Sequence, residues 1–83
     1  MIVDRMTPIP LHAQVASSIK SLISDGIYAP GALLPSEREM CDKYGVSRTT
    51  IRETLRQLEG EGLIRKVAGR GIFVNESSPD LAV

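Results

Sequence analysis

The sequence has very few residues that could form disulfides or bind metals. Cys41 is the one cysteine and His12 the one histidine among the 83 residues. A lone cysteine cannot form an internal disulfide, which is typical of proteins in the reducing cytoplasm, and two such ligands are too few for a metal cage. We therefore predict a cytoplasmic protein without a metal or cofactor, with Cys41 in the core and His12 at the surface.

Signals for membranes, secretion and catalysis are lacking as well. The longest apolar run is only a few residues, and the first five residues lack the apolar core of a secretion signal. No Ser–His–Asp or Cys–His set is available, and the carboxylates of Glu59 and Glu61 fall at an expected helix end without an obvious pocket. An enzyme is therefore disfavoured. A chain of 83 residues with 42% hydrophobic residues has room for one small globular domain.

The formal net charge is zero, which by itself argues against a nucleic-acid partner, but the charges are unevenly distributed. Residues 43–74 contain seven lysines and arginines against three glutamates, a net charge of +4, whereas residues 1–42 and 75–83 each carry −2. A basic segment beside acidic ones indicates a partner for the basic segment more strongly than the neutral total argues against one.

Three helices are predicted in the first 60 residues. Apolar residues at helical spacing predict a helix from Leu11 to about Asp25, which Gly26 stops. Ser36 and Glu39 have the spacing of a capping box, which predicts a second helix ending near Tyr44. We expect this helix to turn three side chains inward, namely Met40, Cys41 and Tyr44.

The third helix follows a tight turn. Gly45 is a plausible left-handed residue at the end of the second helix, and Ser47 caps a third helix that runs to about Glu59. Alternating residues then predict strands at 63–67 and 71–74, joined by a hairpin tip at 68–70. Three helices followed by a two-stranded wing define a winged helix-turn-helix, an α+β fold that is mostly α.

The third helix separates apolar and basic residues onto different faces. Ile51, Leu55, Leu58 and Thr54 form one stripe for the core, and a separate face carries Arg48, Thr49, Arg52 and Arg56. A helix fits the major groove of DNA, and the fork of an arginine can hold both acceptors of guanine. The alternative, a winged helix that binds another protein, would favour an exposed apolar patch at this face.

The predicted hairpin tip carries Arg70 between Gly69 and Gly71. An arginine at such a tip can enter the minor groove, where the potential is most negative. A plain β-turn explains the two glycines equally well, so this motif supports DNA binding only through its position after the helix-turn-helix.

Four motifs in order resemble the N-terminal domain of the GntR family of bacterial transcription regulators, over about residues 8 to 75. They are Gly31–Glu39 (GALLPSERE), Tyr44–Arg52 (YGVSRTTIR), Leu58–Ile64 (LEGEGLI) and Gly69–Val74 (GRGIFV). The opening Pro10-Leu11 with Gln14, and the Gly-Arg-Gly wing, look most like the HutC subfamily. Met40-Cys41 replaces the usual Leu-Ala, and Ile72 replaces the usual wing threonine.

This resemblance implies sequence-specific binding to a pseudo-palindromic operator as a homodimer, most often in repression, with a small-molecule effector bound by a C-terminal domain. We expect residues 8–75 to form the DNA-binding domain and residues 76–83 to begin a linker, because 83 residues are too few for the effector domain as well. The predicted DNA-binding residues come from the start of the second helix, the start of the third helix and the wing. They are Ser36, Arg38, Ser47, Arg48, Thr49, Thr50, Arg52, Gly69, Arg70 and Gly71.

Overall fold

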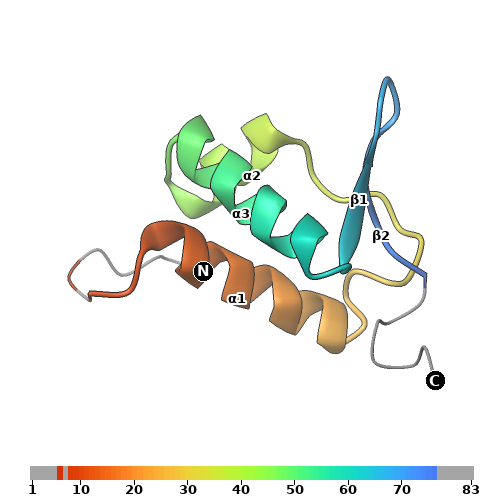
Figure 1. Cartoon of the computed structure of the whole chain (residues 1–83), viewed down its shortest axis with the longest axis horizontal. Helices are drawn as coiled ribbons and strands as arrows, with labels where there is room; N and C mark the ends of the chain where they lie inside the picture. Colours follow the sequence, from red (N-terminus) through yellow and green to blue (C-terminus); the bar gives the residue numbers. More distant parts are fainter. Residues whose placement is uncertain (1–5, 7, 77–83) are drawn as a thin grey trace.

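The computed structural model describes residues 6 and 8–76, in which three helices precede a β-hairpin (Figure 1). The helices α1 and α3 pack along each other, α2 lies beside the beginning of α3, and the hairpin stands at the end of α3. The tip of the hairpin projects away from α1. The winged helix-turn-helix predicted from the sequence is confirmed, and its elements are α1 (Leu11–Ser24), α2 (Glu37–Tyr44), α3 (Arg48–Gly60), β1 (Ile64–Val67) and β2 (Gly71–Val74).

Local capping signals fix the ends of α2. The hydroxyl of Ser36 accepts a hydrogen bond from the amide of Glu39 at 3.1 Å, and the Glu39 carboxylate accepts one from the amide of Ser36 at 2.9 Å. At the other end, Gly45 adopts φ +65°, and its amide donates to the carbonyl of Cys41. Both predicted caps are therefore present. Met40 is buried as predicted, whereas Cys41 is half-buried at the edge of the core.

The core forms where the apolar stripe of α3 meets α1. Ile51, Thr54, Leu55 and Leu58 are all 0% exposed, as the spacing of the stripe predicts. The Thr54 hydroxyl is satisfied in this setting because it lies 2.8 Å from the carbonyl of Thr50 and 3.2 Å from that of His12. The other buried apolar residues are Val15, Ala16, Ile19, Leu34, Met40, Tyr44, Ile64, Ile72 and Val74.

The two strands pair in antiparallel register, with Ile64 opposite Val74 and Val67 opposite Gly71. The first strand begins at Ile64, one residue later than predicted, because the amide of Leu63 still closes the end of α3 through a 3.0 Å bond to Leu58. Asn75 belongs to the fold, since its side-chain amide donates to the carbonyl of Gly62 at 2.6 Å.

A segment before α2 covers the outer edge of β2. The amide of Leu34 donates to the carbonyl of Ile72 at 2.7 Å, and the amide of Val74 donates to that of Ala32 at 2.9 Å. Leu33 forms an isolated antiparallel bridge with Phe73. The hairpin is thereby tied to the helices before α2, which fixes the direction in which its tip points.

Candidate nucleic-acid interface

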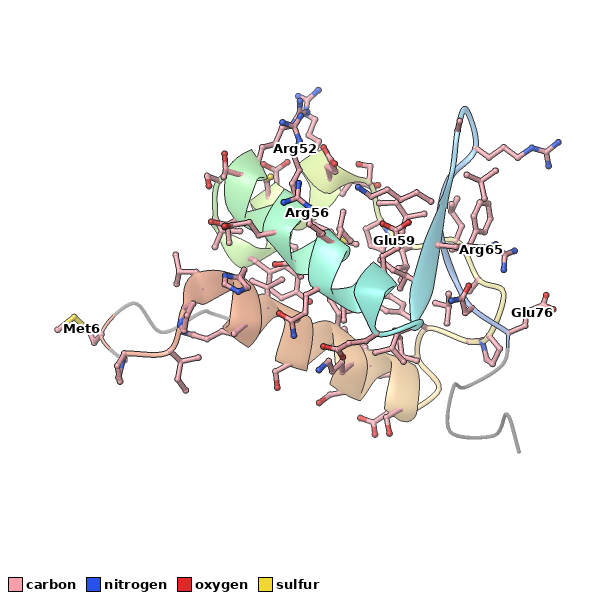
Figure 2. All side chains as sticks on the ribbon, in the orientation of Figure 1. Met6, Arg52, Arg56, Glu59, Arg65 and Glu76 are labelled. Carbon is pink, nitrogen blue, oxygen red and sulfur yellow. The ribbon has the colours of Figure 1, made fainter. Side chains whose placement is uncertain are left out.

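The basic residues of α3 lie on the side of the molecule away from α1. Figure 2 shows Arg52 and Arg56 projecting from α3 on this side, where the hairpin tip also rises. Arg48 and Thr49 are exposed at the first turn of the same helix, and Arg52 and Arg56 are exposed further along it. The face that the sequence predicts for α3 is therefore open to a partner, while the apolar stripe faces α1.

The N-terminus of α3 uses two of the predicted site hydroxyls for capping. The Ser47 hydroxyl accepts from the amide of Thr50 at 3.2 Å and donates to the Thr50 hydroxyl at 3.1 Å. Capping of this kind satisfies only one of the free amides at the start of a helix. The remaining first-turn amides, those of Arg48 and Thr49, are suited to a phosphate, because the helix dipole also favours an anion there.

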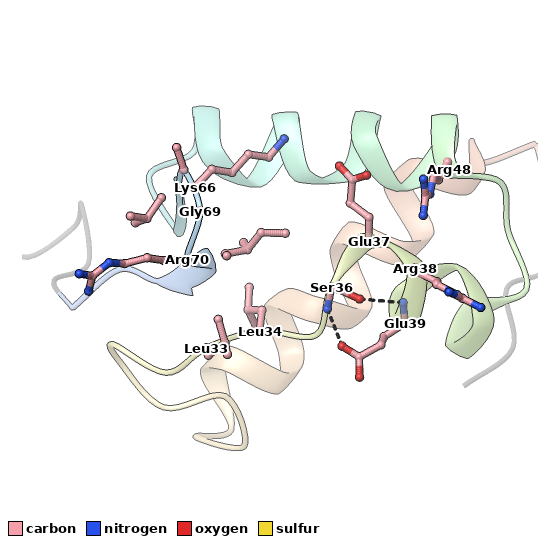
Figure 3. A pocket seen from close by; sticks show the side chains of 14 residues that line it. Leu33, Leu34, Ser36, Glu37, Arg38, Glu39, Arg48, Lys66, Gly69 and Arg70 are labelled. Atoms are coloured by element: carbon pink, nitrogen blue, oxygen red, sulfur yellow. Dashed lines mark hydrogen bonds between the residues drawn. The ribbon is translucent and has the colours of Figure 1, made fainter.

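A groove of about 660 Å³ separates the beginning of α2 from the hairpin (Figure 3). It brings together six of the ten predicted residues: Ser36, Arg38, Arg48, Gly69, Arg70 and Gly71. The other four do not line it and lie on the first turns of α3 or at its cap: Ser47, Thr49, Thr50 and Arg52. The predicted residues thus occupy two adjoining surfaces, the groove and the exposed face of α3.

The two glycines of the wing have structural reasons to be glycine. Gly69 has φ +75°, and a Cβ there would meet open space, so the backbone conformation alone favours glycine. Gly71 has φ +125°, and its Cβ would lie 2.9 Å from a methyl carbon of Leu33. Between them, Arg70 closes the turn through its amide and extends an exposed side chain away from α3 (Figure 3).

Lys66 is a groove residue that the predicted site lacks. It lies opposite Ile72 in the strand register, and its side chain reaches from β1 toward α3 (Figure 3). Its neighbour Arg65 is on the other face of the hairpin, where its guanidinium lies 5.7 Å from the ring centre of Phe73. The alternation of β1 after the buried Ile64 was the signal that could have placed Lys66 on the inner face.

Two acidic side chains also line the groove, and each has a partner. The hydrogen bonds of the capping box, first the backbone amide of Ser36 and then its hydroxyl, hold the pKa of Glu39 below its ordinary value. Glu37 lies 3.5 Å from Arg52, measured from the carboxylate Oε1 to the guanidinium Nε. The capping box of Glu39 was predicted from the sequence, whereas the contact of Glu37 with Arg52 was not.

Comparison with known proteins decides the family. The model of "Bacterial regulatory proteins, gntR family" matches residues 11–74, most of the chain. The chain belongs to the GntR family. This GntR domain lies over the residues in which the sequence motifs occur, so the predicted family and its DNA-binding fold are confirmed.

The curated relatives of this GntR domain are transcription regulators, which confirms that it is not an enzyme. The repressor NagR of Bacillus subtilis is 37% identical over all 83 residues, which are 34% of NagR. The histidine utilization repressor of Klebsiella aerogenes is 39% identical over 87% of the chain and 30% of that protein, compatible with the HutC likeness. The Glc operon transcriptional activator of Escherichia coli is 48% identical over 74% of the chain and 24% of that protein.

The chain therefore spans about a quarter to a third of the length of these relatives. Among solved structures, AraR(DBD) in complex with operator ORX1 superposes with a TM-score of 0.84 at 35% identity. That match covers 89% of this chain and 94% of the other.

Within residues 6 and 8–76, no cluster of three or more His, Cys, Asp or Glu could hold a metal, and no helix is long and apolar enough to cross a membrane.

Proposed function

We propose that this domain binds operator DNA in a sequence-specific manner, with α3 in the major groove and the hairpin tip at the neighbouring minor groove. One observation carries the proposal: the exposed arginines of α3 adjoin the groove that carries Arg38, Arg48 and Lys66, and the wing borders this groove. A helix and a projecting hairpin on one cationic side match the two grooves of a duplex and the phosphate ridge between them. The likeness to AraR(DBD), solved with an operator, supports this use.

The geometry indicates which residues contact bases and which contact phosphates. We assign base contacts to Arg48 and Arg52, which lie on the exposed side of the first turns of α3. Phosphate contacts are assigned to the N-terminal turns of α2 and α3, because free amides, hydroxyls and arginines there suit a phosphodiester. The residues in this second set are Ser36, Arg38, Ser47, Thr49 and Thr50, and the wing residues Gly69, Arg70 and Gly71 are assigned to the minor groove.

For the whole regulator, we infer a homodimer in the cytoplasm that binds a pseudo-palindromic operator and responds to a small effector through a further, HutC-like domain. A linked dimer would let two domains occupy half-sites about one helical turn apart. We favour repression, because NagR and the histidine utilization protein are named as repressors; the Glc operon relative is an activator, which makes activation the alternative.

The domain boundaries stay those predicted from the sequence. We place the DNA-binding domain at residues 8–75 and the start of a linker at 76–83. The hydrogen bonds of the Asn75 side chain to Gly62, in the turn after α3, and to Ile64 in β1 support the boundary after residue 75. Residues 77–83, most of the proposed linker, lie outside the described residues.

Selection from random duplexes tests the proposal without knowledge of the operator. The domain should enrich one short motif, and its affinity for the selected duplex should fall steeply between low and moderate salt, because phosphate contacts release counterions. Enrichment without any preferred sequence would contradict sequence-specific binding. No retention of DNA at either salt concentration would favour the alternative of a protein-binding winged helix.

Lys66 and Arg65 offer a matched test of the groove. Lys66→Ala should weaken binding about equally on all sequences and reduce the slope of log affinity against log salt by roughly one, because Lys66 faces the groove. Arg65→Ala removes the same charge one residue away, but from the outer face, and should leave the slope nearly unchanged. Equal salt slopes for the two variants would exclude the groove as a binding surface for the phosphate backbone of DNA.

Arg70→Ala should weaken binding without changing thermal stability, because its side chain is exposed at the tip of the hairpin. Arginines in the minor groove respond to groove width, so the loss should be largest on duplexes with A·T-rich steps beneath the wing. Affinities are compared on duplexes that differ only in those steps. Identical affinities of variant and parent on the A·T-rich duplex would remove the wing arginine from the interface.

A further inference from the structure

Glu37 is an acidic residue in the middle of a basic surface. It is the first residue of α2 and lines the groove together with Arg38, Arg48 and Lys66. A carboxylate at this place repels the phosphates of any duplex that approaches the groove. Its presence therefore lowers affinity for all sequences, and this cost needs an explanation.

The stability of α2 supplies only part of one, because Glu37 lies in the first turn, where the helix dipole favours an anion. The capping box is complete with Ser36 and Glu39, so the end of the helix has its carboxylate without Glu37. Figure 3 shows the Glu37 carboxylate pointing toward α3, whereas Glu39 points to the other side, back to Ser36. Its side chain is only 28% exposed although it belongs to a surface helix, so it occupies the space between the two helices.

The partner of Glu37 across this space is Arg52. The 3.5 Å contact joins a Glu37 oxygen to Nε, the donor nearest the arginine stem. The guanidinium is planar and rigid, so a carboxylate beside Nε favours one orientation of the whole fork. The two terminal nitrogens are not used by this contact, and paired donors of this kind match N7 and O6 of guanine in the major groove. The Arg52 side chain, 57% exposed, can reach a duplex from there.

We propose that Glu37 is a positioning residue for Arg52, which raises base discrimination at the expense of general affinity for DNA. The carboxylate presents the guanidinium fork toward a guanine. Its negative charge, 3.5 Å from Arg52, also weakens the attraction of this arginine for a phosphate. This inference rests on the proposed function, because it assigns a role within the same DNA interface.

Glu37→Gln tests the proposal, with Glu53→Gln as the matched control. Glu53 follows Arg52 on α3 and is exposed, so its replacement makes the same change of charge beside the same arginine. Dissociation constants are measured for the selected duplex, for versions with each G·C pair replaced, and for a random duplex. Glu37→Gln should bind the random duplex roughly two- to fivefold more tightly and lose about three- to tenfold of the preference at one G·C pair. Glu53→Gln should keep the parent's preference at every position.

A double-mutant cycle separates positioning from a general change of charge. In an Arg52→Lys background, Glu37→Gln should no longer alter the base preference, because the fork that it orients is absent. Glu37→Asp keeps the charge but shortens the reach, so it should lose the preference while keeping the parent's salt slope. Thermal melting identifies any variant that fails to fold. If Glu37→Gln does not fold, Glu37→Asp provides the measurement of base preference.

Two results have different meanings. If Glu37→Gln and Glu37→Asp both keep the parent's preference at every base pair while Arg52→Ala loses it, the positioning role is wrong and Glu37 only repels DNA. If the parent itself shows no preference on any duplex, the proposed function is wrong, and so is the positioning role of Glu37.

Discussion

Replacing Leu55 by alanine should lower the free energy of unfolding by about 2–5 kcal/mol, because the side chain is 0% exposed where α3 packs on α1. The total stability of small domains is about 5–15 kcal/mol, so this loss is a large fraction of it. In a domain of this size each kcal/mol shifts the melting temperature by roughly 4–8 °C. Circular dichroism during heating and in urea measures both quantities.

Leu33→Ala is the matched control for this prediction. It removes the same atoms from a leucine that is 60% exposed, and its backbone bridge to Phe73 does not need the side chain. The expected change is within about 0.5 kcal/mol, as for surface positions in general. Equal losses for the two variants would mean that the stripe of α3 is not the centre of the core.

Elements with local signals were predictable from the sequence. Ser36 and Glu39 stand three residues apart and satisfy each other's backbone amides, which requires no knowledge of the rest of the chain. Gly45 is recognisable for a similar reason, because few other residues adopt a left-handed conformation at a helix end. The stripe through Ile51 and Leu55 follows from helix geometry alone.

Contacts between distant segments were not predictable in this way. The edge contact of residues 31–34 with β2 joins segments about 40 residues apart through backbone groups, which carry no sequence signature. The contact of Glu37 with Arg52 depends on how closely α2 approaches α3. The alternation of β1 could have placed Lys66 on the inner face of the hairpin, but the groove that it lines depends on the direction of the hairpin and became visible only in the folded chain.

The same limit applies to the predicted site. Residue types and helical spacing placed the arginines of α3 on one exposed face, and the structure has them there. They did not reveal that the hydroxyls of Ser47 and Thr50 bond to each other. A phosphate contact by either hydroxyl competes with the cap, which makes the amides of this turn the better phosphate ligands.

Arg52→Ala should remove about 1–3 kcal/mol of discrimination at one G·C pair, which is the largest effect that we expect on DNA recognition. Arg52 is exposed on the second turn of α3, and its contact with Glu37 leaves the terminal nitrogens for a base. Arg52→Lys should lose much of the same discrimination while keeping the charge, because an ammonium group cannot reproduce the fork. Titration against the selected duplex and its single-pair variants measures the discrimination.

The salt dependence distinguishes this role from a phosphate contact. Neutralising a phosphate ligand would weaken binding equally on all sequences and reduce the salt slope by roughly one. Arg52→Ala should instead leave the slope nearly unchanged, because we assign its fork to a base and not to a phosphate. Arg56→Ala, one turn further along the same exposed face, controls for the loss of an arginine from α3. If Arg52→Ala and Arg52→Lys both keep the parent's preference at every base pair, Arg52 does not read a base, and the recognition face must be centred on Arg48 instead.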